Sequence, residues 1–142
     1  MRYENRIEAL LATATPAIGT IKYQAQPTAN EWQVIHWLHR HLGGDILFLA
    51  PSTTFEVKSP DLMWRGGFVD IKHIQGNLNT LGNKIKKAMK QTSYHGVILE
   101  VSAMVFSDDE IIQEAQKKLA RLNGSYCIII RDERLIAYIN RA

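Results

Sequence analysis

A β-hairpin is predicted over residues 60–72, and it constrains the fold more than any other part of the chain. The Gly66-Gly67 pair separates two short arms rich in branched and aromatic residues, which is the pattern of two antiparallel strands joined by a tight turn. Such a hairpin belongs to a larger sheet, and the helical segments before and after it are expected to cover the faces of that sheet.

Three charged residues accompany this hairpin. Asp61 stands just before the first arm, and Asp70 and Lys72 lie on the second. Because residues two apart on a strand point to the same face, Asp70 and Lys72 project together. Two carboxylates with a neighbouring backbone carbonyl can hold a hard divalent cation, and a lysine beside them can orient a water molecule or stabilise developing charge. This combination of groups is suited to the hydrolysis of a phosphodiester.

The spacing of these residues resembles a known family. Pro60-Asp61, a hairpin and then Asp70-Ile71-Lys72 resemble the core motif of the PD-(D/E)xK nuclease superfamily, which includes many restriction enzymes. Residues 49–52 and 86–91 resemble, more narrowly, the C-terminal tRNase toxins of CdiA-type contact-dependent growth inhibition proteins. The resemblance covers residues 29–102. It implies a metal-dependent endonuclease, with Mg²⁺ or Mn²⁺ as cofactor, that cleaves tRNA as a toxin domain.

The resemblance also implies partners, a location and a fourth site residue. A cognate immunity protein would block the toxin, which would be exported as part of a larger cell-surface protein and act in the target-cell cytoplasm. An acid on the first core helix often completes the site in this superfamily, and Glu31 is the acid in the matching helix. The implied catalytic set is Glu31, Asp61, Asp70 and Lys72, with Asp61 and Asp70 as the metal ligands. A competing explanation is that Thr28 and Glu31 form a capping box.

A basic helix is expected after the hairpin, near residues 79–91. Related nucleases carry lysine or glutamine on this helix near the scissile phosphate, which points to Lys86, Lys87, Lys90 and Gln91 as substrate-binding residues. The alternative is a solvated helix face whose Ile85 and Met89 pack inward. Trp64 is a further candidate, because a half-buried tryptophan beside the hairpin can stack on a base.

Other groups of residues permit different sites. Glu56-Val57-Lys58, with Asp45 upstream, is a second acid-x-lysine match, but no hairpin turn separates the pair and its surroundings are loop-like. His36 and His39 share a helix face at a spacing that can chelate zinc, although no zinc-site signature follows them, and the pattern is more typical of polar surface residues. His73 follows Lys72 and therefore points to the opposite face of its strand.

The remaining periodicity predicts an α/β fold in which helices flank a mixed β-sheet, matching a restriction-endonuclease-like (PD-(D/E)xK) core. Helices are expected over 2–13, 30–42, 79–91 and 107–122, and further strands over 45–50, 96–102, 125–131 and 135–140, with 45–50 in a central position. Residues 1–26 are interpreted as an N-terminal helix and linker arm, and residues 27–142 as the nuclease domain.

Composition limits the function classes only broadly. The 142 residues are 46% hydrophobic and 22% charged, as in ordinary globular domains, and no apolar run is long enough for a membrane span. The net charge of +3 permits a polyanionic partner without requiring one. Two alternatives to the tRNase stay open: a DNA endonuclease of the same fold, and a non-catalytic nucleic-acid-binding module. The enzymes require Asp61, Asp70 and Lys72 to converge in space, whereas the module does not.

Overall fold

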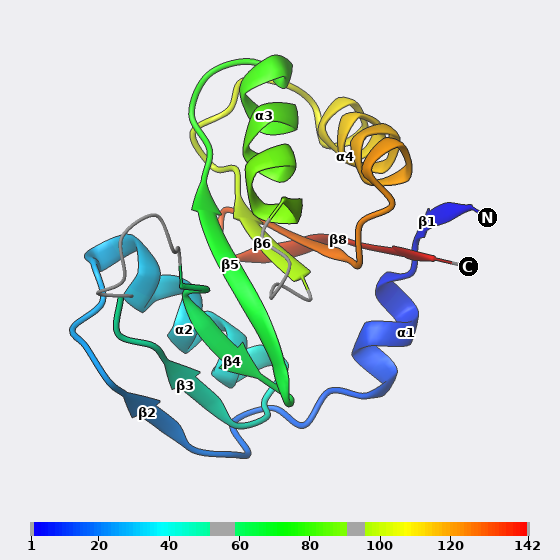
Figure 1. Ribbon diagram of the computed structural model, residues 1–142. Coiled ribbons are helices and arrows are strands. Elements are labelled where there is room, and N and C mark those ends of the chain that lie inside the picture. The colour runs from blue at the N-terminus through cyan, green and yellow to red at the C-terminus, as the bar shows by residue number, and fades with distance from the viewer. Residues whose placement is uncertain (1, 52–58, 91–95, 142) are drawn as a thin grey trace.

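One mixed sheet organises the part of the chain that the structure describes (Figure 1). The structure is a computed structural model that describes residues 2–51, 59–90 and 96–141. Within these ranges eight strands pair in the order β1-β8-β7-β6-β5-β4-β3-β2. The pairs β2–β3, β5–β6 and β6–β7 are parallel, and the other pairs are antiparallel. The strands are β1 (Tyr3–Asn5), β2 (Ile21–Tyr23), β3 (Ile46–Phe48), β4 (Leu62–Trp64), β5 (Gly67–His73), β6 (Gly96–Glu100), β7 (Cys127–Arg131) and β8 (Arg134–Arg141).

Helices cover both faces of this sheet, so the predicted architecture of a mixed sheet flanked by helices is confirmed (Figure 1). The helices are α1 (Ile7–Ala12), α2 (Ala29–His41), α3 (Leu78–Met89) and α4 (Asp108–Leu122). Buried residues of α1 and α2 share one core with β3, β4 and the α2-facing side of β5. Buried residues of α3 and α4 share a second core on the opposite face. The long central strands β6 and β7 contribute side chains to both cores, as expected of strands buried on both faces.

Local sequence signals fix the starts of two helices. Thr28 accepts a hydrogen bond from the backbone of Glu31, whose carboxylate accepts one from the backbone of Thr28, so α2 begins with the predicted capping box. Ser107 and Glu110 form the same reciprocal pair at the start of α4. These caps satisfy N–H groups that have no partner within the helix.

The first residues of the chain differ from the predicted helix over 2–13. Residues 3–5 form β1, which pairs antiparallel with β8, and the helix begins only at Ile7. Tyr3 explains the difference, because its ring is buried in the core and its hydroxyl donates to the carbonyl of Gly124 at 2.6 Å. Residues 3–23 therefore supply both edge strands of the sheet, and the boundary expected at residue 26 stays a prediction.

The hairpin forms as predicted, but its turn lies one residue earlier than expected. Trp64 pairs with Gly67, so the two turn residues are Arg65 and Gly66, with φ of 51° and 78°. Positive φ at both positions is the geometry of a type I′ turn, which matches the natural twist of two antiparallel strands. The expected central place of residues 45–50 is also wrong, because β3 lies next to the edge strand β2.

The sheet pairing decides which face carries the candidate site. Asp70 and Lys72 pair in parallel register with Val97 and Leu99 of β6, and directly paired residues point to the same face. Val97 and Leu99 lie in the core that α3 and α4 cover. The side chains of Asp70 and Lys72 therefore emerge on the α3 side of the sheet.

Candidate active site

Asp61 and Asp70 meet across the hairpin. The backbone N–H of Asp61 donates to the carbonyl of Val69 at 3.1 Å, next to the last β4–β5 pair, Leu62–Val69. Asp61 thereby lies beside Asp70, and their side chains share a hydrogen bond. The Asp61 carboxylate also accepts the backbone N–H of Ile71 at 2.6 Å. A turn at Gly66-Gly67 would have placed Asp61 opposite Lys72 instead.

Lys72 completes the cluster from the same strand. Its Nζ lies 2.9 Å from Oδ2 of Asp70, and both side chains are largely buried. Asp70 is only 4% exposed and is the one charged residue among those described that is fully buried. Charged groups are seldom buried unless they are paired. Burying even the paired Asp70 and Lys72 side chains costs desolvation free energy. The predicted convergence of Asp61, Asp70 and Lys72 is therefore observed.

The environment of Asp61 favours its protonated form. Burial raises its pKa to about 8, with further contributions from the hydrogen bond and charge of Asp70 and from the charge of Glu31. The N–H of Ile71 opposes this shift only in part, because it stabilises the carboxylate. Two acids that share a proton in this way form a site that a divalent cation can occupy in place of that proton.

Glu31, at the start of α2, lies near Asp61. Glu31 and Asp61 line the same pocket of about 430 Å³, and the charge of Glu31 contributes to the raised pKa of Asp61. Oε1 of Glu31 accepts the N–H of Thr28 at 2.8 Å, so the capping box is formed as well. The two interpretations of Glu31 are thus compatible: the cap fixes its carboxylate at the wall of the site.

The carboxylate oxygens available as metal ligands suit a small, hard cation. Across residues 2–51, 59–90 and 96–141, no group of three or more His, Cys, Asp or Glu side chains is arranged to enclose a metal ion. Asp61 and Asp70 supply two carboxylates, and Mg²⁺ is commonly bound by one or two carboxylates with water and substrate phosphates completing its octahedron. The pair therefore fits Mg²⁺ or Mn²⁺ better than a zinc ion, which prefers four protein ligands of nitrogen and sulfur.

The basic helix α3 is present, and its lysines are exposed. Lys86, Lys87 and Lys90 lie on the solvent side, while Ile85 and other apolar residues pack against the sheet. This arrangement is compatible both with substrate binding and with the solvated-face alternative, so the role of these lysines stays a prediction. Gln91 and the alternative Glu56-Val57-Lys58 motif lie outside the described residues.

The histidines make separate contacts and form no shared site in the described part of the chain. His36 Nε2 lies 2.9 Å from the hydroxyl of Tyr23, and His39 Nε2 lies 2.9 Å from the carbonyl of Gly19. His73 lies 2.7 Å from Glu100 and lines a pocket with residues of α2, on the opposite face from Lys72 as predicted. These contacts agree with polar surface histidines rather than a zinc pair.

The side chain of Trp64 is not exposed for stacking on a base. Its side chain is 5% exposed, and its indole N–H donates to the carbonyl of Gly43 at 2.8 Å. The Arg65 guanidinium lies over this ring at 4.5 Å. A buried tryptophan with its N–H satisfied has a packing role.

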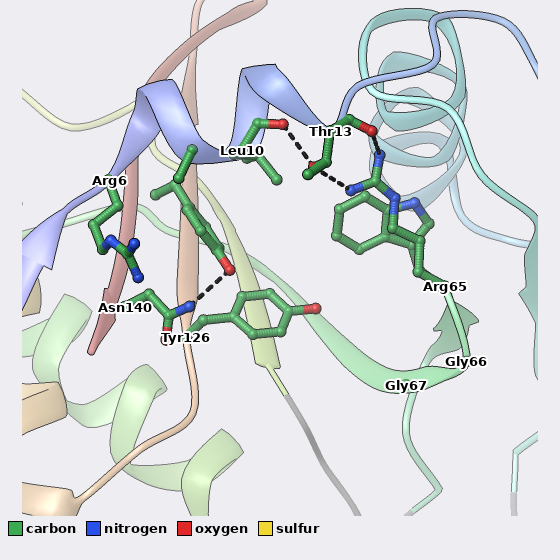
Figure 2. A pocket seen from close by; sticks show the side chains of 11 residues that line it. Arg6, Leu10, Thr13, Arg65, Gly66, Gly67, Tyr126 and Asn140 are labelled. Carbon is green, nitrogen blue, oxygen red and sulfur yellow. Dashed lines mark hydrogen bonds between the residues drawn. The ribbon is translucent and has the colours of Figure 1, made fainter. Parts of the chain in front are cut away.

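Arg65 instead fixes the hairpin turn to two helices. Its guanidinium donates to Oγ1 and the carbonyl of Thr13, both at 3.1 Å, and to the carbonyl of Leu42 at 2.8 Å. Thr13 and Leu42 are the C-caps of α1 and α2, where carbonyl groups lack helical partners and a cation is favourable. Figure 2 shows this residue at the wall of a pocket of about 390 Å³ whose lining holds two arginines and two tyrosines but no carboxylate. This pocket lies at the turn end of the hairpin and is separate from the acidic cluster.

Sequence reasoning missed Trp32. Helical periodicity over residues 30–42 predicts a buried stripe of Trp32, Ile35, Leu38 and Leu42, whereas the residues that α2 buries are Val34, Ile35, Trp37 and Leu38. Trp32 is 50% exposed beside Glu31. The capping box could have given the signal, because it fixes where α2 begins and places Trp32 in its first turn.

Comparison with known proteins finds a similarity of fold. No protein-family model matches the chain, and no curated protein matches its sequence. A solved structure described as "CdiA-CT/CdiI toxin and immunity complex from Burkholderia pseudomallei" has a similar fold, with a TM-score of 0.54 and 16% sequence identity. The likeness covers 84% of this chain and 99% of that chain. The chain thus shares its architecture with one chain of that toxin and immunity complex. No helix among the described residues has the length and apolar character to cross a membrane.

Proposed function

We propose that this chain is a metal-dependent endoribonuclease of the PD-(D/E)xK type that cleaves tRNA as the toxin domain of a contact-dependent growth inhibition system. The observation that carries the proposal is the meeting of Asp61, Asp70 and Lys72 at the hairpin. Perturbed, closely paired carboxylates are characteristic of sites that perform chemistry. The fold it shares with a protein from a toxin and immunity complex supports the biological setting.

Each residue has a role in hydrolysis under this proposal. Asp61 and Asp70 would hold the divalent cation, which when bound neutralises charge on the phosphate and activates water. The Lys72 ammonium has three N–H donors and uses one on Asp70, which leaves donors to orient the attacking water and steady the phosphate oxygens. Glu31, fixed by its cap, would accept a hydrogen bond from water in the same pocket. The attacking oxygen bonds to phosphorus as the bond to the leaving oxygen breaks, and that oxygen then takes up a proton.

The same candidate site favours the interpretation that this chain is a toxin and not an immunity protein. The description of the similar structure names both members of a complex. A carboxylate such as Asp70, buried with Lys72, is expensive to maintain, and a protein that only blocks a partner has no use for it. We therefore propose that this chain is the member that an immunity protein inhibits, and that it acts in the cytoplasm of the target cell after export within a larger cell-surface protein.

The direct test uses purified protein with total tRNA and with plasmid DNA, in Mg²⁺, in Mn²⁺ or in EDTA. We expect discrete tRNA fragments that EDTA abolishes. Asp70→Asn should reduce the cleavage rate by at least about 100-fold, the size of effect seen when one electrostatic group of an active site is removed. The matched control is Asp109→Asn, which removes an exposed carboxylate from the first turn of α4 and should leave cleavage intact. DNA nicking without tRNA cleavage would favour a DNA endonuclease, and cleavage of neither would contradict the proposal.

A further inference from the structure

An exposed aromatic residue lies next to the candidate active site. Trp32 directly follows Glu31 in the first turn of α2 and is 50% exposed. The other two tryptophans, Trp37 and Trp64, are 5% exposed, and each donates its indole N–H to a backbone carbonyl. An exposed, rigid aromatic ring at the edge of a candidate site is a surface on which a ligand ring can stack.

The ring of Trp32 is held in place by its neighbours. Its centroid lies 3.9 Å from that of His36, one helical turn further along α2, with 31° between the ring planes. His36 is in turn fixed by the hydroxyl of Tyr23, at the end of β2, through a 2.9 Å contact. The aromatic surface is therefore preorganised, and a ligand that stacks on it loses little freedom in ordering it.

A pocket of about 450 Å³ opens beside this surface. Its lining consists of Tyr23, Gln24, Ala25, Gln26, Pro27 and Trp32, and none of these residues carries a formal charge. Aromatic rings and amide groups are what proteins use to bind unstacked nucleobases, whereas phosphates call for cations. Gln24 is anchored, because its Oε1 accepts the N–H of Ala50 at 3.2 Å.

This pocket borders the pocket that Glu31 and Asp61 line. Ala25 and Gln26 line both of them, and the second pocket contains Glu31 and Asp61. A nucleic-acid strand whose phosphate is held by a cation at Asp61 would thus place an adjacent base near Trp32.

We propose that the pocket formed by Tyr23, Gln24, Gln26, Pro27 and Trp32 binds an unpaired nucleobase next to the cleaved phosphodiester, with Trp32 as the stacking surface. This inference rests on the proposed function, because it assumes that the carboxylates act on a nucleic acid. It also predicts a substrate preference. The substrate must present an unpaired base beside the cleaved bond, so a loop or single-stranded end is preferred over a continuous duplex.

Tryptophan fluorescence tests this inference without requiring cleavage. In an Asp70→Asn background, a single-stranded RNA oligonucleotide should quench the emission, because Trp32 is the exposed tryptophan. Trp32→Phe should remove the quench and keep binding within about threefold, since a phenyl ring still stacks. Trp32→Ala should weaken binding by about 5- to 150-fold, the range for one base stacked on an aromatic ring. Val105→Ala, at an exposed apolar residue before α4, should change neither result.

A nucleotide scan locates the base. In a set of oligonucleotides with one abasic position each, the one that lacks the stacked base should bind more weakly than the others and should fail to quench Trp32. The same series of oligonucleotides made as DNA shows whether the pocket distinguishes ribose from deoxyribose. Binding that is unchanged in Trp32→Ala, or binding without any quench, would overturn the inference and would favour a protein partner on this surface. Cleavage by the wild type without quenching would leave the proposed function intact, whereas quenching without cleavage would overturn only the proposed function.

Discussion

Asp61 and Asp70 share a side-chain hydrogen bond although a β-turn separates them in the chain. The relationship depends on the register of the β4–β5 hairpin, in which Leu62 pairs with Val69. A two-residue turn at Arg65 and Gly66 produces this register, and the side chains of directly opposed residues lie on the same face. The conformation of the turn therefore determines whether Asp61 and Asp70 meet in the candidate active site.

The stability of the metal-free protein should fall as the pH rises from about 4 to 8. The folded state keeps a proton on Asp61, whose pKa is raised to about 8, while the unfolded chain releases it near pH 4. Because the folded state binds more protons in this window, the free energy of unfolding decreases with rising pH, by at most about 1.4 kcal/mol per unit. Urea denaturation in EDTA at several pH values measures the slope.

Asp61→Asn is the control for this pH dependence. Asparagine keeps an oxygen for the N–H of Ile71 and cannot ionise. The variant should lose the part of the slope that belongs to Asp61, while the rest of the pH dependence should be equal in both proteins. An identical slope in the wild type and in Asp61→Asn would show that this carboxyl is not protonated in the fold.

Divalent cations should stabilise the protein even without substrate. At a Mg²⁺ concentration 100-fold above the dissociation constant, a ligand that binds only the folded state adds about 2.7 kcal/mol. Thermal unfolding in MgCl₂, against KCl of equal ionic strength, measures the shift. Asp61→Asn and Asp70→Asn should each abolish it, and Asp109→Asn should retain it. A shift that survives both substitutions would place the cation elsewhere.

Removal of Lys72 should harm the fold as well as the activity. Lys72→Met leaves the Asp70 carboxylate buried without its cation, and breaking a buried pair on one side costs on the order of 3 kcal/mol. The double variant Asp70→Asn, Lys72→Met should regain part of this loss, with a coupling energy of about 1–3 kcal/mol in a denaturation cycle. Strictly additive effects would mean that the two side chains do not interact in solution.

Substitutions at Arg65 should separate the turn conformation from the contacts of its side chain. Arg65→Ala and Arg65→Gly both lose the bonds to Thr13 and Leu42, at a cost of roughly 1–3 kcal/mol. Glycine accepts a φ of 51° without strain, so Arg65→Gly should be more stable than Arg65→Ala by about 1 kcal/mol. Chemical denaturation of the two variants compares them, and equal stability would argue against a left-handed conformation at this position.

Much of the fold could be predicted from the sequence, because its signals are local. The capping residues Thr28 and Ser107 mark the starts of α2 and α4, and both capping boxes are present. The turn at Asp132 and Glu133 joins β7 to β8 between the predicted strands 125–131 and 135–140, with both residues at positive φ. The edge strand β1 could not be predicted, because its pairing with β8 joins opposite ends of the chain.

The candidate site was predictable in its residues but not in its register. Asp61, Asp70 and Lys72 follow from their spacing around the hairpin together with the resemblance to the PD-(D/E)xK motif, since strand periodicity places the latter two on one face. The turn was misplaced by one residue because Gly66-Gly67 satisfies the local preference equally well, whereas the bonds from Arg65 to Thr13 and Leu42 are tertiary contacts. Trp32 was assigned to the core for the same reason: helical periodicity does not tell which of two adjacent faces the sheet covers.

The pairing of β1 with β8 gives the molecule a mechanically weak edge. Tyr3 lies opposite Arg141, so both ends of the described chain leave from the same end of one antiparallel pair (Figure 1). A force that pulls these ends apart would load the ladder one hydrogen bond at a time, which is unzipping rather than shear. Stretching in an optical trap should therefore begin with the release of β1 at low force, at the opposite edge of the sheet from β2 and the aromatic surface of Trp32.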